Sequence, residues 1–168
     1  MVKTIDRISG EAMKLISILA MTVIAISTYA SAENKTEVFS SKDVTPQFAT
    51  LLETAKASGS SGATLGNYQS HAIKLSLRTA SGGAEVHARY DDIFVVTEGK
   101  ATLVTGGTVI EPKDQSDGET QGSGIQNGES QAIVKGDIVH IPAGTPHQLM
   151  IAAGDTFGAI VVKVKEAP

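Results

Sequence analysis

Residues 136–147 read GDIVHIPAGTPH and decide how the C-terminal half of the chain is interpreted. The stretch begins with a strand-like run, reverses at Pro142-x-Gly144 and ends on His147, where another strand-like run begins. Proline fixes its own φ angle, and glycine permits a reversal that other residues resist. The pattern therefore predicts a tight turn that aims His147 back across a β-sheet.

The sequence around this turn has the pattern of short strands. Apolar and polar residues alternate between Ile73 and Arg78, as they do in a half-buried strand. Other strand-like runs, separated by glycine-containing turns, lie at residues 93–97, 101–105, 132–134, 138–141, 148–151 and 157–164. Many short strands with glycine turns predict an all-β sandwich or barrel. The exception is residues 106–128, where six of 23 residues are Gly; this segment predicts a long surface loop with one strand near residues 109–110.

One short amphipathic helix is expected before the strands. Thr45 is a suitable N-cap, and Pro46 suits the first helical position. The following apolar residues recur at the spacing of one helical face, which predicts a helix from Pro46 to Lys56. Residues 33–69 are thus interpreted as a helix and linker, and residues 70–168 as the barrel.

Residues 1–32 have the pattern of a signal peptide. Lys14 precedes an apolar run at residues 15–26, which as a helix rises only about 18 Å and is too short for a hydrocarbon core of about 30 Å. Ala30 and Ala32 fit the small-residue cleavage pattern, which predicts cleavage before Glu33. We expect a secreted or periplasmic protein without stable membrane insertion after cleavage. Translation starts either at Met13 or upstream, where it adds an extended n-region.

Composition and charge narrow the classes of partner and site. The 168 residues include 14 Lys+Arg and 18 Asp+Glu, for a formal net charge of -4, and the basic residues form no run. A nucleic-acid partner is therefore not expected. The chain has no Cys, so disulfides and thiolate metal sites are excluded, and any metal must be held by His, Asp and Glu.

The stretch at residues 136–147 resembles the second motif of the cupin superfamily, G-x5-P-x-G-x2-H-x3-N. Gly136, Pro142, Gly144 and His147 match it, and Ile151 replaces the final Asn. The resemblance covers residues 70 to 165 and implies a cupin-type double-stranded β-helix, a jelly-roll β-barrel, with one short N-terminal helix. It also implies a divalent metal inside the barrel.

The first cupin motif, G-x5-H-x-H-x3-4-E-x6-G, is matched only in degenerate form. Aligned without a gap, Glu85 takes the place of the first histidine, His87 is the second, and Asp92 replaces the glutamate. Gly99 closes the motif, while Thr79 stands where the leading Gly is expected. With His147, the resemblance thus implies the metal ligands Glu85, His87, Asp92 and His147. Imidazole and carboxylate suit Mn, Fe, Zn, Ni or Cu, and spacing does not choose between them.

A second register of the first motif is open. A one-residue gap moves His87 to the first histidine position and puts Arg89, which cannot bind a cation, at the second. We favour the gap-free register, because a slip by one residue would turn Glu85 and His87 away from the cavity together.

Three further residues are candidates for roles around the site. His71 shares strand parity with Ile73, so it is expected to face the barrel interior as a substrate-binding group or as a core residue. Arg89 either anchors an anionic substrate at the mouth or forms a surface ion pair with Asp91 or Asp92. His140 is interpreted as structural.

Three functions are compatible with the sequence, because fold does not settle chemistry. The first is a metal-dependent enzyme, of oxygenase, isomerase or lyase type, acting on a small oxygen-rich molecule. The second is a non-enzymatic small-ligand binding protein of the cell envelope, for example a sugar binder, and the third is a purely structural protein. The sequence contains no G-x-S-x-G, G-x-x-x-x-G-K or H-E-x-x-H motif. An open sheet edge favours pairing of two copies, so a homodimer is compatible with the sequence.

Overall fold

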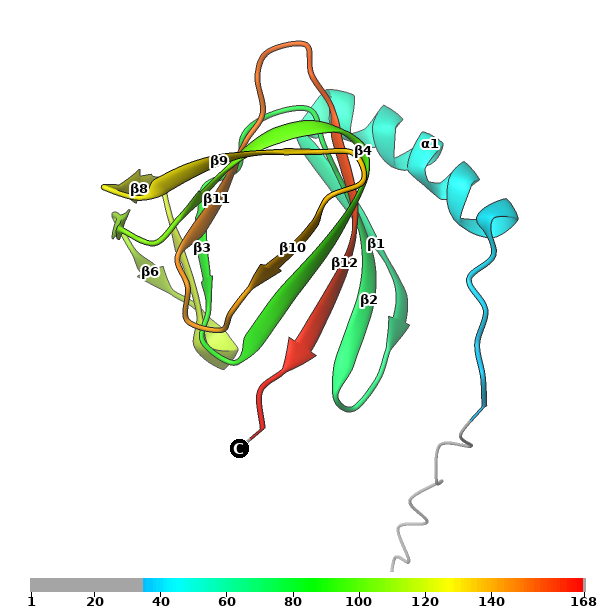
Figure 1. Ribbon diagram of the computed structural model, residues 1–168, viewed down its shortest axis with the longest axis horizontal. Helices are drawn as coiled ribbons and strands as arrows, with labels where there is room; N and C mark the ends of the chain where they lie inside the picture. Colours follow the sequence, from blue (N-terminus) through cyan, green and yellow to red (C-terminus); the bar gives the residue numbers. More distant parts are fainter. Residues whose placement is uncertain (1–34, 168) are drawn as a thin grey trace, which may run out of the picture. The chain divides into compact units, whose positions relative to one another are not determined.

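The computed structural model describes residues 35–167, in which a helix is followed by an antiparallel β-barrel (Figure 1). Residues Glu37–Pro168 form one compact unit that contains both the helix and the barrel. The predicted signal peptide at residues 1–32 lies outside the described residues. Within residues 35–167, no helix is long and apolar enough to cross a membrane.

Helix α1 spans Ser41–Ser58 and is longer than predicted at both ends. It is preceded by Ser40, whose hydroxyl donates to a carboxylate oxygen of Asp43 at 2.6 Å, so the expected N-cap Thr45 lies inside the helix. The helix ends at Gly59, which adopts a left-handed φ of 83° and donates its N–H to the carbonyl of Ala55. Glycine takes this conformation without steric cost, which explains the sharp stop.

The strands form two antiparallel sheets that share the long strand β4. One sheet has the order β1-β2-β12-β4-β10, and the other contains β9, β4, β11, β3, β7 and β6. A separate pair is formed by β5 and β8. The strands are β1 (Ser60–Asn67), β2 (His71–Arg78), β3 (Ala84–His87), β4 (Tyr90–Thr105), β5 (Thr108–Ile110), β6 (Lys113–Asp114), β7 (Glu119–Gly122), β8 (Gly124–Gln126), β9 (Glu129–Val134), β10 (Ile138–Ile141), β11 (His147–Met150) and β12 (Phe157–Lys165). The all-β jelly-roll fold with one N-terminal helix is thereby confirmed.

Three segments differ from the sequence-based expectation. The runs at residues 93–97 and 101–105 form one continuous strand, β4, rather than two. Residues 60–67, which were assigned to the linker, form β1 and pair with β2 at the edge of the sheet. Residues 106–128, which were expected to form a surface loop, contain β5, β6, a short 3₁₀ turn at Ser116–Gly118, β7 and β8. The strand expected near residues 109–110 is confirmed as β5. Strand β7 pairs with β3, so the segment extends a sheet of the barrel and the prediction of a long surface loop is wrong.

Two apolar clusters stabilise the fold. Leu75 and Leu77 of β2 pack with Leu51 and Ala55 of α1, which covers the outer face of the sheet. The second cluster lies between the two sheets and includes the fully buried Phe157. Full burial of one large apolar side chain stabilises a protein by about 1.5–3 kcal/mol. Because the outer apolar face of β2 is taken by α1, the polar face of this strand is turned into the barrel.

Candidate metal centre

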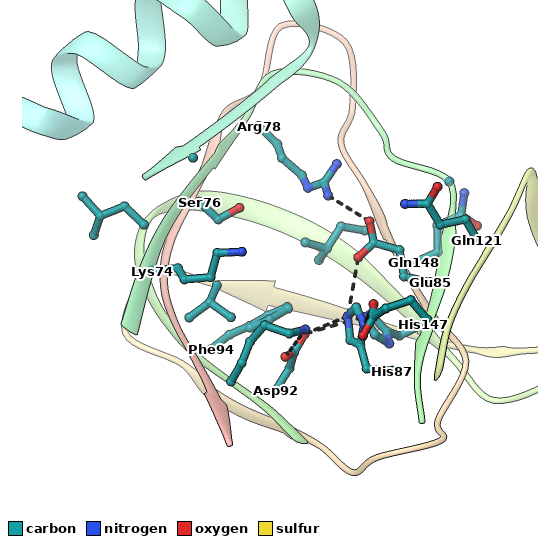
Figure 2. A pocket seen from close by; sticks show the side chains of 17 residues that line it. Lys74, Ser76, Arg78, Glu85, His87, Asp92, Phe94, Gln121, His147 and Gln148 are labelled. Carbon is teal, nitrogen blue, oxygen red and sulfur yellow. Dashed lines mark hydrogen bonds and ion pairs between the residues drawn. The ribbon is translucent and has the colours of Figure 1, made fainter. Parts of the chain in front are cut away.

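The barrel encloses a cavity of about 470 Å³ that is lined by both sheets (Figure 2). Phe94, Leu149 and Val161 give it an apolar part continuous with the core. The rest of the lining is polar and contains Glu85, His87, Asp92, His147, Lys74, Ser76, Arg78, Glu119, Gln121, Gln148 and Lys163. A concave site with a few converging polar groups is the usual form of a small-molecule site.

The turn before His147 is held by contacts with β3 and β4. Gly144 adopts a φ of 75° and donates its N–H to the carbonyl of His87 at 2.9 Å. Asp91 accepts the N–H of Ala143 at 2.7 Å, and this bond, with a weaker one from His140, lowers the pKa of the Asp91 carboxyl. These contacts fix the place at which β11 begins, and so the position of His147.

His147 is 4% exposed and has a defined tautomer. Its Nδ1 lies 3.0 Å from the carbonyl oxygen of Thr145. A carbonyl oxygen can only accept, so Nδ1 carries the proton and the Nε2 lone pair is free. Burial lowers the pKa of His147, which favours the neutral ring. The side chain is therefore prepared to bind a cation through Nε2.

His87 is 8% exposed and has a carboxylate at each ring nitrogen. Its Nδ1 contacts a carboxylate oxygen of Glu119, and its Nε2 lies 3.3 Å from Oδ2 of Asp92. Burial lowers the pKa of His87, but the hydrogen bond to Asp92 and the charge of that carboxylate contribute to a net rise. Nδ1 is thus held by Glu119, while Nε2 faces Asp92 in the lining of the cavity.

Glu85 completes a group of three ligand atoms. Its carboxylate oxygen Oε2 lies 3.7 Å from Nε2 of His87, and one atom from each of Glu85, His87 and His147 lies within 4.8 Å of the others. His147 and Glu85 are cross-strand partners of β11 and β3. His147 presents Nε2 while its Nδ1 is held by a protein acceptor, as metal-ligating histidines usually are, whereas Nε2 of His87 is also in contact with Asp92 and would exchange that contact for a metal ion. The residues present thus fit a divalent metal ion.

Asp92 lies beside this group but interacts most closely with a cation of the chain itself. Its Oδ1 accepts a hydrogen bond from Lys163 Nζ at 2.9 Å, and its Oδ2 lies 3.9 Å from Nε2 of His147. Burial raises the pKa of Asp92, but the hydrogen bond from His87 and the charge of Lys163 contribute to a net lowering. Of the four predicted ligands, the structure groups three, and it places Asp92 next to them as a paired carboxylate.

Glu119 and Gln121 line the cavity but were missed by the sequence analysis. Both come from β7, where they pair with His87 and Glu85 of β3, respectively. The alternation of Glu119, Thr120 and Gln121 was the one available signal. The glycine-rich composition of the surrounding segment hides this alternation, because such a composition is typical of a loop.

Three other candidates lie outside the cavity. His71 shares a face of β2 with Leu75, which packs on α1, and its ring stacks on Tyr68 at 4.7 Å. The expectation that this face lines the barrel interior is therefore wrong. Arg89 is 62% exposed and pairs with Asp117 at 2.9 Å, rather than with Asp91 or Asp92, while His140 pairs with Asp91 at the surface.

The arrangement of Glu85 and His87 bears on the register of the first motif. Both side chains line the cavity, while Arg89 lies on the surface. This is the arrangement of the gap-free reading. A Pro-x-Gly turn thus delivers His147 into a jelly-roll barrel, beside a histidine and a carboxylate of the first motif. The fold is that of a cupin.

Comparisons with known proteins give structural neighbours of this chain. One is the polyketide cyclase RemF from Streptomyces resistomycificus, at 18% identity and a TM-score of 0.47, covering 66% of this chain and 68% of that one. Another is a protein with a double-stranded β-helix domain from Klebsiella pneumoniae, at 16% identity and a TM-score of 0.48, covering 63% and 76%. A third is the DMSP lyase DddQ from Ruegeria pomeroyi, at 18% identity and a TM-score of 0.46, covering 62% of this chain.

The structural neighbours show a similar fold but do not place the chain in a protein family. The cupin chain spans only 46% of the length of the DMSP lyase. No family model matches the sequence, and no curated protein matches it.

Proposed function

We propose that this cupin is an exported, metal-dependent enzyme that acts on a small oxygen-rich molecule in the barrel cavity. The observation that carries the proposal is the convergence of Glu85, His87 and His147 at one point of a buried, polar cavity. Two imidazoles and one carboxylate bind first-row divalent ions well, which leaves Mn, Fe, Zn, Ni and Cu as candidates.

The number of protein ligands favours a reactive site over a structural one. Structural metal sites usually have all positions filled by protein, whereas catalytic sites keep a position for water or substrate. Glu85, His87 and His147 would hold the metal here, and three ligands leave such a position open. A bound ion would supply Lewis-acid chemistry or oxygen activation.

The residues around the three ligands keep the site in one geometry. Glu119 holds His87 through Nδ1, and the Thr145 carbonyl holds His147 through Nδ1. Phe94, Leu149 and Val161 give one side of the cavity an apolar lining. Preorganised ligands need no rearrangement before a substrate binds.

Asp92 and Lys163 supply a fixed hydrogen-bonding pair beside the ligands. The lowered pKa keeps the Asp92 carboxyl ionised, so its Oδ2 can accept a hydrogen bond from a water or a substrate hydroxyl. Lys163 is an ammonium donor on the same side and holds Oδ1. Together they would orient a hydroxyl group at the metal position without a change in their own charge.

An open coordination position can be tested directly with cobalt. Protein stripped of metal is loaded with one equivalent of Co²⁺ and titrated with azide while the visible spectrum is recorded. We expect saturable changes in the d–d bands, which are lost in the His147→Ala variant. The Lys42→Met variant, changed on the outer helix, serves as a control and should behave as the parent protein. A spectrum unaffected by azide would contradict the proposed enzyme site.

The alternative function is that of a non-enzymatic small-ligand binding protein of the cell envelope. It is favoured by the polar side chains of β2, which line the cavity beside the candidate metal ligands. Incubation of metal-loaded protein with small oxygen-rich molecules separates the two functions, because the enzyme consumes its ligand and a binding protein returns it unchanged. The polar lining of the cavity argues against a purely structural role.

A further inference from the structure

The inward face of β2 carries three polar side chains that line the cavity. Lys74, Ser76 and Arg78 alternate along the strand and all line the cavity. Among the described residues 35–167, the Nε of Arg78 is buried and has no hydrogen-bond partner. The nearest charged contact is between Arg78 Nη2 and Glu85 Oε1, at 3.7 Å. A buried polar atom without a partner, here the Nε of Arg78, calls for an explanation.

The position of these β2 side chains relative to the candidate metal centre indicates how a ligand would lie in the cavity. Figure 2 shows Lys74, Ser76 and Arg78 projecting from β2 toward the cavity, with Glu85 and His147 on its other side. A molecule that occupies the cavity would contact the metal ligands at one end and the β2 side chains at the other. Lys74 and Arg78 carry eight N–H donors and no acceptor, so they require a ligand with acceptor atoms.

The charges that line the cavity indicate the sign of that ligand. The basic side chains are Lys74, Arg78 and Lys163, and they are matched in number by the carboxylates Glu85, Asp92 and Glu119. Lys163 is engaged with Asp92, Glu119 with His87, and Arg78 with Glu85 at 3.7 Å. The exposed Lys74 has no carboxylate of the described residues within 4.0 Å. A divalent ion held by Glu85, His87 and His147 would add two positive charges without a counter-charge. The cavity is therefore suited to an anion.

We infer that the ligand of the cavity is a small organic acid whose carboxylate is bound by Lys74, Arg78 and Ser76 of β2. This inference rests on the proposed function in one respect, because the other end of the organic acid would face the metal ion. A carboxylate is planar and matches the fork of a guanidinium group. Inorganic phosphate carries more charge than one carboxylate and would meet Glu85 beside Arg78 at greater cost. A dicarboxylate would neutralise both charges added by a divalent ion.

The test measures anion binding by calorimetry, separately from metal binding. The probes are oxalate, malonate and succinate, with malonamide, succinamide and inorganic phosphate as comparisons, and each is titrated into metal-free and Zn²⁺-loaded protein. We expect at least one dicarboxylate to bind both forms, with higher affinity for the loaded form, and the neutral amides not to bind. Loss of a charged hydrogen bond should weaken binding about tenfold or more in Lys74→Met and Arg78→Met.

A control variant and a metal-free titration distinguish the anion site from the metal-dependent function. Lys42→Met removes the same charge from the exposed helix surface and should bind as the parent does. Because Arg78 contacts Glu85, Lys74→Met is the decisive variant should Arg78→Met fail to fold. Equal affinity of Lys74→Met and parent, tighter binding of phosphate than of every dicarboxylate, or no dicarboxylate binding to either form would overturn the inference. Failure to bind Zn²⁺ while dicarboxylates still depend on Lys74 would refute the metal-dependent function and leave the anion site intact.

Discussion

Removal of the Glu119 carboxylate should weaken metal binding although Glu119 is not one of the three grouped ligands. Its side chain is 31% exposed and contacts Nδ1 of His87, which fixes the ring with Nε2 toward the cavity. Loss of such a contact behind a ligating histidine generally lowers metal affinity by about 10- to 100-fold, or about 1.4 to 2.7 kcal/mol. We expect Glu119→Ala to show a loss in this range. Glu119→Gln, which keeps an acceptor for Nδ1–H, should lose less.

Competition with a chromogenic chelator measures this difference for Zn²⁺. The control is Glu129→Gln, which removes the same charge from an exposed position of β9. Thermal unfolding of the metal-free variants separates a local effect from loss of the fold, since one partly exposed polar contact is worth about 1 kcal/mol. Equal Zn²⁺ affinity of Glu119→Ala and the parent protein would show that the His87 orientation does not depend on β7.

Three further predictions follow from other parts of the molecule. The pKa of His87 is raised and a metal needs the neutral ring, so Zn²⁺ binding should release a proton, and Zn²⁺ affinity should fall about tenfold per pH unit below that pKa. Calorimetry in buffers of different ionisation enthalpy measures both the proton release and the affinity. Zn²⁺ binding independent of pH would count against His87 as a ligand. Phe157→Ala should lower the free energy of unfolding by about 3–5 kcal/mol in urea denaturation, since Phe157 is fully buried, and a loss below 1 kcal/mol would contradict the packing described. The mature protein should begin at Glu33 by intact-mass measurement on exported material, and a species that retains residues 15–26 would refute the signal peptide.

The residues that the sequence identified best belong to local patterns. His147 is set by a turn of a few residues, and its direction follows from Pro142 and Gly144. Glu85 and His87 are two residues apart in one short strand, so their common face follows from strand geometry. In both cases the information needed lies within one stretch of the chain.

The residues that the sequence missed depend on contacts between distant segments. Alternation divides β2 into two faces, but only the position of α1 shows that the face with Leu75 is covered from outside and the face with Lys74 lines the cavity. His71 was therefore assigned to the wrong side. Similarly, Glu119 reaches the site only because β7 pairs with β3, and no short-range pattern specifies that pairing.

The helix start shows how a favourable local signal can be misread. Thr45 and Pro46 have the chemistry of a helix start. The helix nevertheless begins earlier, where the carbonyl of Ser40 accepts the N–H groups of Asp43 and Val44. Proline is also tolerated after the first turn of α1, where the loss of one hydrogen bond is offset by packing of the apolar face on β2.

The most direct test of the metal centre is elemental analysis of the protein purified without a histidine tag, together with its His147→Ala variant. We expect about one divalent first-row ion per chain in the parent protein and none in the His147→Ala variant, with the same far-ultraviolet circular dichroism spectrum for both. His147 is buried at the cavity and contacts metal-ligand candidates rather than the main apolar core, so its loss should remove the ion and leave the barrel folded. A parent protein without metal after growth in metal-supplemented medium, or a variant that retains one ion per chain, would contradict the assignment of Glu85, His87 and His147 as the metal centre.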